Sequence, residues 1–150
     1  MTAMPPITSA GAQRWIRFTL AQQDYAVDIR CVREVLSHAA IEPVPGAPPT
    51  VLGVINLRGQ IVTVLDFPAW LGRNPRTGDG PVLVMDHRGV VLALAIDAIH
   101  DVTRLDPDDI KPVPRTGTAT RPECLQGLVV RDGGLLSLFN ADVLIAQLVG

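Results

Sequence analysis

Two short motifs occur twice in this chain of 150 residues, in the same order. Residues 41–45 (IEPVP) return 69 positions later as residues 110–114 (IKPVP). Residues 53–59 (GVINLRG) return 74 positions later as residues 127–133 (GLVVRDG). Several motifs that recur in one order at nearly one spacing indicate two copies of a structural unit. The repeat therefore predicts two similar halves that pack face to face.

The segments between the prolines and glycines predict that both halves are built from strands. Pro and Gly number 13 each, and the stretches between them are short and rich in Val, Ile and Leu. Short strands with turns every 8–12 residues are typical of small barrels or a sandwich. Nothing alternates strand with long helix, so a nucleotide-binding α/β fold is not expected. The predicted strands are residues 15–20, 25–29, 51–57, 61–66, 82–85, 90–96, 125–130 and 135–139.

Helical and irregular segments complete the predicted layout. Apolar residues from Ile29 to Leu36 recur at helical spacing, which predicts a short helical turn. Asn140 suits the N-cap of a closing helix at the C-terminus. Residues 1–13 are predicted to be a flexible tail. Residues 14–150 then form a single domain whose halves, about 14–72 and 81–150, are joined by a polar linker.

Composition and missing motifs exclude several functional classes. The 13 Lys+Arg and 15 Asp+Glu give a net charge of −2, and no basic run stands out, which argues against nucleic acid and anionic membranes. No apolar run reaches the ~18 residues of a membrane span, so no insertion into a membrane is expected. Cys31 and Cys124 lie far apart without a CxxC motif, which predicts a cytoplasmic protein with two unpaired thiols. Metal-ligand spacings, nucleophile elbows and phosphate loops are absent from the sequence, so it gives no positive support for a metal, a cofactor or catalysis.

Two groups of residues are candidates for binding a partner. Arg58 lies in a hairpin turn whose copy carries Asp132 instead, so the turn itself does not demand arginine; Gly59 recurs because the turn needs a positive φ. Its guanidinium suits a partner's carboxylate, but a solvated surface arginine explains it equally well. Glu34 lies between Val32 and Leu36, and an extended chain would place all three on one face. A carboxylate between two aliphatic residues suits an interface edge; the alternative is a partly exposed strand with one solvated acid.

An ordered set of short motifs runs along the chain: YAVDI at 25–29, VxEV at 32–35, PxxP at 45–48, GxxNLRG at 53–59 and VxxLD at 62–66. With these motifs, residues 14–148 resemble the CheW coupling proteins of bacterial chemosensory systems. The resemblance implies two five-stranded, SH3-like β-barrels. It also implies a non-enzymatic adaptor that needs no cofactor. Such proteins couple the cytoplasmic tips of methyl-accepting chemoreceptors to the regulatory domain of a CheA-type histidine kinase, in the cytoplasm, at membrane-associated receptor arrays.

The resemblance also carries over individual residues. Val32, Glu34, Gly53 and Arg58 match positions tied to receptor or kinase coupling, and Asn56 and Leu57 are expected to support the turn. The family's usual Leu-Arg after Asp66 is replaced here by residues 67–70 (FPAW), which leaves the partner's identity open. The alternatives are a scaffold for pilus motility or gene regulation, and a small-molecule-binding barrel. The latter predicts one deep pocket; an adaptor predicts shallow apolar patches.

Overall fold

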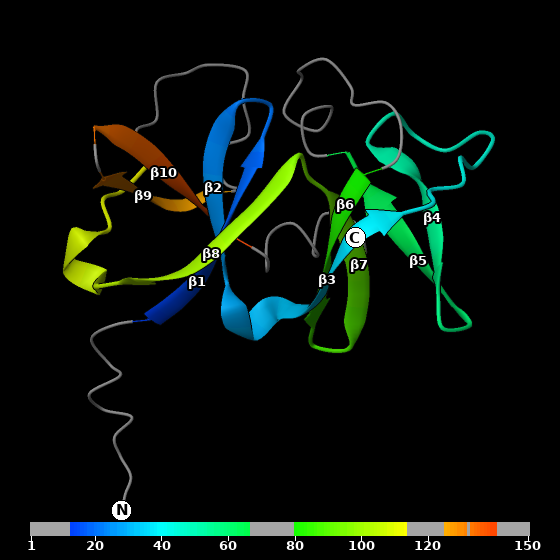
Figure 1. Ribbon diagram of the computed structural model, residues 1–150, viewed down its shortest axis with the longest axis horizontal. Coiled ribbons are helices and arrows are strands. Elements are labelled where there is room, and N and C mark those ends of the chain that lie inside the picture. Colours follow the sequence, from blue (N-terminus) through cyan, green and yellow to red (C-terminus); the bar gives the residue numbers. More distant parts are fainter. Residues whose placement is uncertain (1–12, 67–79, 114–124, 132, 141–150) are drawn as a thin grey trace, which may run out of the picture.

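The computed structural model describes residues 13–66, 80–113, 125–131 and 133–140, and these form two five-stranded sheets placed side by side (Figure 1). All eight predicted strands are present, and two further strands, β3 and β8, join them. In chain order the elements are β1 (Gln13–Leu20), β2 (Gln23–Asp28), the 3-10 turn η1 (Ile29–Cys31), β3 (Val32–Ala39), β4 (Val51–Leu57), β5 (Gln60–Leu65), β6 (Gly80–His87), β7 (Val90–Ala95), β8 (Ala98–Leu105), the 3-10 turn η2 (Pro107–Asp109), β9 (Leu125–Arg131) and β10 (Gly134–Phe139).

The two sheets have the same strand order once each strand is replaced by its copy in the repeat. The first sheet runs β8-β1-β2-β10-β9 and the second runs β3-β6-β7-β5-β4. Each sheet therefore takes two strands from one half of the sequence and three from the other. The predicted division into one barrel from residues 14–72 and another from 81–150 is wrong. The physical reason is the crossover at η1: β2 pairs within the first sheet, whereas β3 pairs with β6 in the second.

The repeated motifs explain how each sheet is closed into a barrel. Glu42 exchanges two backbone hydrogen bonds of 2.9 Å with Val54 on β4, and Lys111 makes the equivalent pair, 2.8 and 2.9 Å, with Leu128 on β9. The IxPVP segment thus crosses over the edge strand next to the repeated glycine. A Cβ atom on Gly53 would lie 2.3 Å from the carbonyl oxygen of Glu42, so only glycine fits under the crossing segment.

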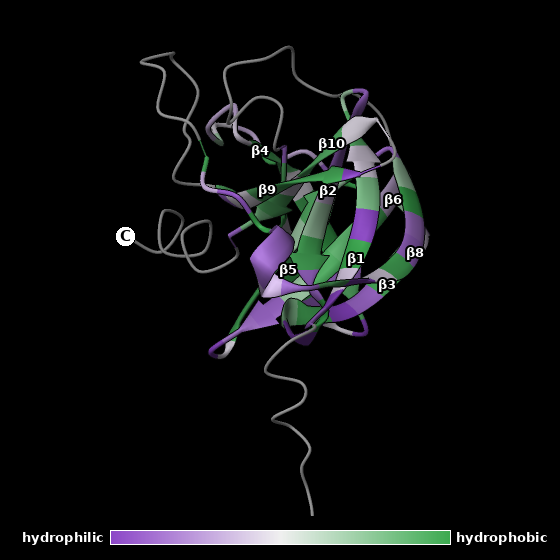
Figure 2. Cartoon of the chain, turned by 90° about the vertical axis from the view of Figure 1, so that its left-hand side faces the viewer, coloured by the Kyte–Doolittle hydropathy of each residue, from purple (hydrophilic) through white to green (hydrophobic). Residues whose placement is uncertain are grey.

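Three apolar clusters hold the barrels together. One cluster, which includes Val62 and Val84, fills the second barrel, and another, which includes Trp15 and Val129, fills the first. The largest combines strands of both sheets, with the rings of Phe18, Tyr25 and Phe139 facing Leu83, Met85, Leu92 and Leu94. The edge strand β8, in contrast, is banded with hydrophilic and hydrophobic residues (Figure 2). The predicted face-to-face packing is thus between the two barrels, and not between the two halves of the sequence.

The segment from Ile29 to Ala39 contains the predicted short helical turn and a strand that was not predicted. The turn is present as η1 but spans only three residues, after which the chain is extended as β3. The register of β3 against β6 shifts between Val32 and Glu34, and this bulge disturbs the alternation that a regular strand would show. Residues 1–12, most of the polar linker, Cys124 and the predicted C-terminal helix lie outside the described residues. Within the described part of the chain, no helix has the length and apolar character needed to cross a membrane.

Candidate interaction site

The β4–β5 hairpin turn fixes the position of Arg58. Leu57 pairs with Gln60, and Arg58 and Gly59 between them have φ of +53° and +89°, which is the signature of a type I′ turn. Asn56 stabilises this turn, because its Oδ1 accepts a 2.8 Å hydrogen bond from the backbone N–H of Gly59. Leu57 is buried in the second barrel's core and ties the turn to it. Asn56 and Leu57 thus fix the turn from its two sides, and Gly59 has the positive φ that the sequence predicts.

Arg58 forms an ion pair with Glu34. Its Nη2 donates a hydrogen bond of 2.9 Å to Glu34 Oε1. Glu34 lies on β3 and Arg58 follows β4, and these are the two edge strands of the second sheet. The ion pair therefore spans the seam where the barrel closes. A φ near +53° at the first turn position costs more conformational free energy for arginine than for asparagine or glycine. Turn geometry therefore does not favour arginine at position 58.

The electrostatics of the pair follow from this contact. The hydrogen bond from Arg58 is the main cause that lowers the pKa of Glu34; burial opposes it, and the charges of Arg58 and Arg33 assist it. The same hydrogen bond, with the charge of Glu34, raises the pKa of Arg58. The Arg58 side chain is 66% exposed and that of Glu34 only 23%. Glu34 Oε2 is buried and accepts no hydrogen bond from the described residues. The pair thus presents a solvated guanidinium that is held by a mostly covered carboxylate.

Sequence reasoning treated Glu34 and Arg58 separately and missed that they meet. It also missed the equivalent link in the other barrel, where the Arg131 guanidinium donates a hydrogen bond to Thr103 Oγ1 between edge strands β9 and β8. Thr103 stands 69 positions after Glu34, as the IxPVP repeat predicts. The arginine is offset by one position, since Asp132 is the aligned copy of Arg58. A comparison of seam-facing positions, instead of turn positions, would have revealed the parallel.

The other candidate residues have different surroundings. Val32 packs with Val35 against the shared core, whereas Leu36 packs against the second barrel's interior. The expectation that Val32, Glu34 and Leu36 share one face is therefore wrong, because the bulge separates Val32 from the other two. Gly53 is buried beneath the crossing segment and offers little surface to a partner.

An exposed apolar residue, Ile61, lies on the same hairpin as Arg58 and was not predicted as a site residue. It stands opposite Asn56 in the hairpin and is 63% exposed. Its copy in the repeat, Leu135, is also an exposed aliphatic. The described residues contain no group of three His, Cys, Asp or Glu side chains placed to bind a metal. Glu34, Asn56, Arg58 and Ile61 thus form one small surface, called here the hairpin site, with an ion pair and an exposed apolar residue.

The fold and this surface define a class: a double-barrel β protein with an ion-paired hairpin on its surface. A family model described as the CheW-like domain matches residues 14–149. The chain belongs to the CheW-like family.

Known proteins similar to the chain agree with this assignment. It is 31% identical over 134 residues to a chemotaxis protein CheW of Rhizobium meliloti, covering 88% of this chain and 86% of that protein. It is 27% identical over 137 residues to a chemotaxis protein CheW of Klebsiella aerogenes, covering 90% and 82%. The crystal structure of the scaffolding protein TtCheW from Thermoanaerobacter tengcongensis superposes with a TM-score of 0.76 at 27% identity, covering 93% of this chain and 87% of that one. The chain is accordingly a scaffold or adaptor protein of chemotaxis signalling, and a small-molecule-binding barrel is not favoured.

Proposed function

We propose that this adaptor couples the cytoplasmic tips of methyl-accepting chemoreceptors to the regulatory domain of a CheA-type histidine kinase. It acts in the cytoplasm at membrane-associated receptor arrays, by contact alone, without catalysis or a cofactor. The observation that carries the proposal is the ion pair between Glu34 and Arg58 on the hairpin site. Both residues match positions that the family resemblance ties to coupling, and the fold brings them within 2.9 Å although 24 positions separate them.

The geometry suggests how the hairpin site recognises a partner. The Arg58 guanidinium has further N–H donors in a planar fork, which suit a carboxylate or a backbone carbonyl of the partner. Glu34 holds the guanidinium in one orientation and so reduces the conformational entropy that binding would cost. Ile61 supplies exposed apolar area on the same hairpin. Three buried or partly buried residues support the hairpin site without contacting a partner. Gly53 and Leu57 keep the barrel closed, and Val32 anchors the start of β3 to the shared core.

The test uses two matched arginines. Arg58 and Arg88 both occupy the first position of a two-residue turn, with φ of +53° and +54°, and each is followed by a glycine at positive φ. Arg58→Asn suits the turn but removes the pair with Glu34. Arg88→Asn makes the same change in the β6–β7 turn. We expect Arg58→Asn to weaken binding to a purified receptor-tip fragment or to a purified kinase regulatory domain by roughly tenfold, as for a small cluster of interface contacts, and Arg88→Asn to leave both unchanged.

The melting midpoint of each variant is measured beside the binding. Asparagine is favoured in this turn, so Arg58→Asn should melt close to the unaltered protein. Unchanged binding to both partners in a folded Arg58→Asn protein contradicts the proposed role of the hairpin site. Equal losses in Arg58→Asn and Arg88→Asn would also contradict it, because they would show an effect of net charge.

A further inference from the structure

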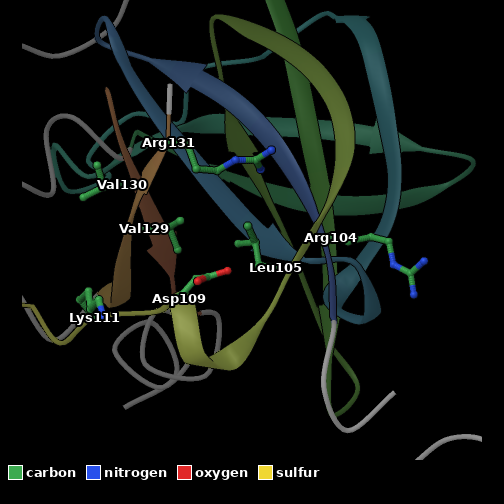
Figure 3. Close-up of a pocket in the computed structure, with 7 residues that line it drawn as sticks. All are labelled: Arg104, Leu105, Asp109, Lys111, Val129, Val130 and Arg131. Carbon is green, nitrogen blue, oxygen red and sulfur yellow. The ribbon is translucent and has the colours of Figure 1, made fainter. Parts of the chain in front are cut away.

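The first barrel has an open groove along its seam, between edge strands β8 and β9 (Figure 3). The groove has a volume of about 410 Å³. Its floor is apolar, since Leu105 and Val129 are 3% and 2% exposed and belong to the barrel's core. One end is closed by the hydrogen bond of Arg131 to Thr103, and the other by the backbone bridge between Lys111 and Leu128.

The charge around this groove is mainly positive, in a protein whose net charge is −2. Of the residues that the structure describes, Arg104, Lys111 and Arg131 line it, against the single acid Asp109. Among the described residues, none of the three cations is in an ion pair, whereas Arg17, Arg30, Arg33 and Arg58 all are. Figure 3 shows the Asp109 carboxylate directed toward the space between Leu105 and Val129, while the Arg104 side chain extends outward. Anions are thus favoured at the rim of the groove and not at its centre.

The edge of β9 offers backbone groups to a ligand in this groove. In a strand, the N–H and C=O of alternate residues point to the same side. Those of Leu128 point away from β10, because they bond to Lys111. Those of Val130 therefore point to the same side, toward β8. No described residue forms a hydrogen bond with the N–H or C=O of Val130 on that side. The crossing segment pairs with β9 only at Lys111, and the residues before Lys111 turn away as η2. The Val130 side chain is 70% exposed.

We propose that this groove is a docking site for an extended, acidic segment of a partner protein, which adds as a short strand to the free edge of β9. Main-chain bonds to Val130 would give affinity, as in other cases of strand addition. Aliphatic side chains of the segment would cover the exposed Val130 above the apolar floor, and side-chain carboxylates at its two ends would meet Lys111, Arg104 or Arg131. The occupant differs from that of the hairpin site, and the proposal does not depend on the adaptor function.

The probe is the peptide acetyl-Glu-Val-Thr-Val-Glu-amide, titrated into the ¹⁵N-labelled full chain and followed by NMR. It is acidic at both ends and has a hydroxyl donor at its centre, opposite Asp109. We expect saturable shifts that centre on the amides of Val130, Arg131 and Lys111. The same peptide N-methylated at its three central residues keeps its charge but cannot donate to the strand edge, and it should not saturate. Shifts that centre on another part of the chain, an absence of shifts at millimolar peptide, or equal binding of the N-methylated peptide would overturn the proposal.

Charge variants provide the second arm of the test. Lys111→Glu should weaken binding of the peptide roughly tenfold, because repulsion replaces attraction at the rim. Asp109→Asn should strengthen it. Arg88→Glu makes the same change in net charge as Lys111→Glu but lies on the other sheet, so it should leave binding unchanged. The NMR spectrum of each variant shows directly that it is folded. Equal weakening by Lys111→Glu and Arg88→Glu would show attraction by net charge only and would refute a docking site in the seam.

Discussion

Gly53→Ala tests whether the repeated glycine is needed for closure of the barrel. The alanine Cβ would lie 2.3 Å from the carbonyl oxygen and 2.8 Å from the carbonyl carbon of Glu42. Ordinary contact with the oxygen begins near 3.4 Å, so the crossing segment must withdraw by about 1 Å. Backbone atoms cannot yield as a flexible side chain can. Both 2.9 Å hydrogen bonds between Glu42 and Val54 would be stretched beyond bonding range.

The magnitude follows from three contributions to the free energy of unfolding. Loss of two backbone hydrogen bonds costs about 1 kcal/mol each. Residual overpacking of the buried site costs roughly another 1 kcal/mol, at the low end of its usual range because the segment moves. The reduced freedom of the unfolded chain offsets about 0.5 kcal/mol. The net loss is about 2–3 kcal/mol, which lowers the melting midpoint of a chain of this length by roughly 5–10 °C.

Alanine variants at two further glycines are the controls, and calorimetry and hydrogen exchange compare their stability with that of Gly53→Ala. At Gly127 the closest neighbour is a side-chain carbon of Ile110, at 2.5 Å, and the nearest backbone atom, the Lys111 oxygen, is 3.1 Å away instead of 2.3 Å, so Gly127→Ala should cost less than Gly53→Ala. At Gly134 the nearest atom is 3.7 Å away and φ is not positive, so Gly134→Ala should change stability by less than about 0.5 kcal/mol. The expected loss of stability is therefore largest for Gly53→Ala, smaller for Gly127→Ala and smallest for Gly134→Ala. A Gly53→Ala protein that melts with the unaltered chain, and whose Glu42 and Val54 amides still exchange slowly, would refute this account of closure.

Three further predictions concern titration, folding and the thiols. The pKa of the Glu34 carboxyl, followed by ¹³C NMR, should lie below the usual value of about 4.3, and Arg58→Asn should return the pKa to that value. Because the folded pKa is lowered, the stability due to this pair is present above the usual pKa and is lost as the pH falls through the folded pKa. A chain of residues 1–79 should lack sharp tertiary signals, because neither sheet would be complete, and well-dispersed NMR resonances from it would contradict the interleaved topology. Alkylation under non-reducing conditions should modify both Cys31 and Cys124, whereas a native linkage would contradict the predicted unpaired thiols.

The parts of the fold that the sequence predicted are those set by local chemistry or by repetition. The turn at Gly59 needs positive φ, and the apolar runs of β4 to β7 are bounded by turn residues, so both could be read from neighbouring residues. The repeat of IxPVP and glycine correctly indicated two equivalent units. It did not show that the two units exchange strands. That exchange depends on the direction in which the chain leaves η1, a three-residue turn with no pattern that distinguishes a hairpin from a crossover.

The candidate site was harder to predict because it is assembled across a seam. Glu34 and Arg58 lie on edge strands at opposite ends of one sheet order, and only closure of the barrel brings them together. Ile61 was predicted only as the first residue of a strand, and nothing in that apolar run marks it as exposed, yet it is an exposed residue near the start of β5. Gly53 was chosen as a coupling residue by resemblance alone. Its buried position under Glu42 shows a packing constraint strong enough to account for glycine there.

The interleaved topology bears on how an adaptor of this kind can respond to a partner as one body. Val32 packs against the cluster shared by both sheets, and two residues later Glu34 reaches the seam of the second barrel. The register shift between them turns the chain from one environment to the other. Only the ion pair and three residues of β3 therefore lie between the β4–β5 hairpin and the shared core, so a displacement of the hairpin has a short path to that core. Because β3 bonds to β6, and β6 packs in that core against Phe18 and Tyr25 of the first sheet, the hairpin site connects to the first barrel through contiguous packed residues.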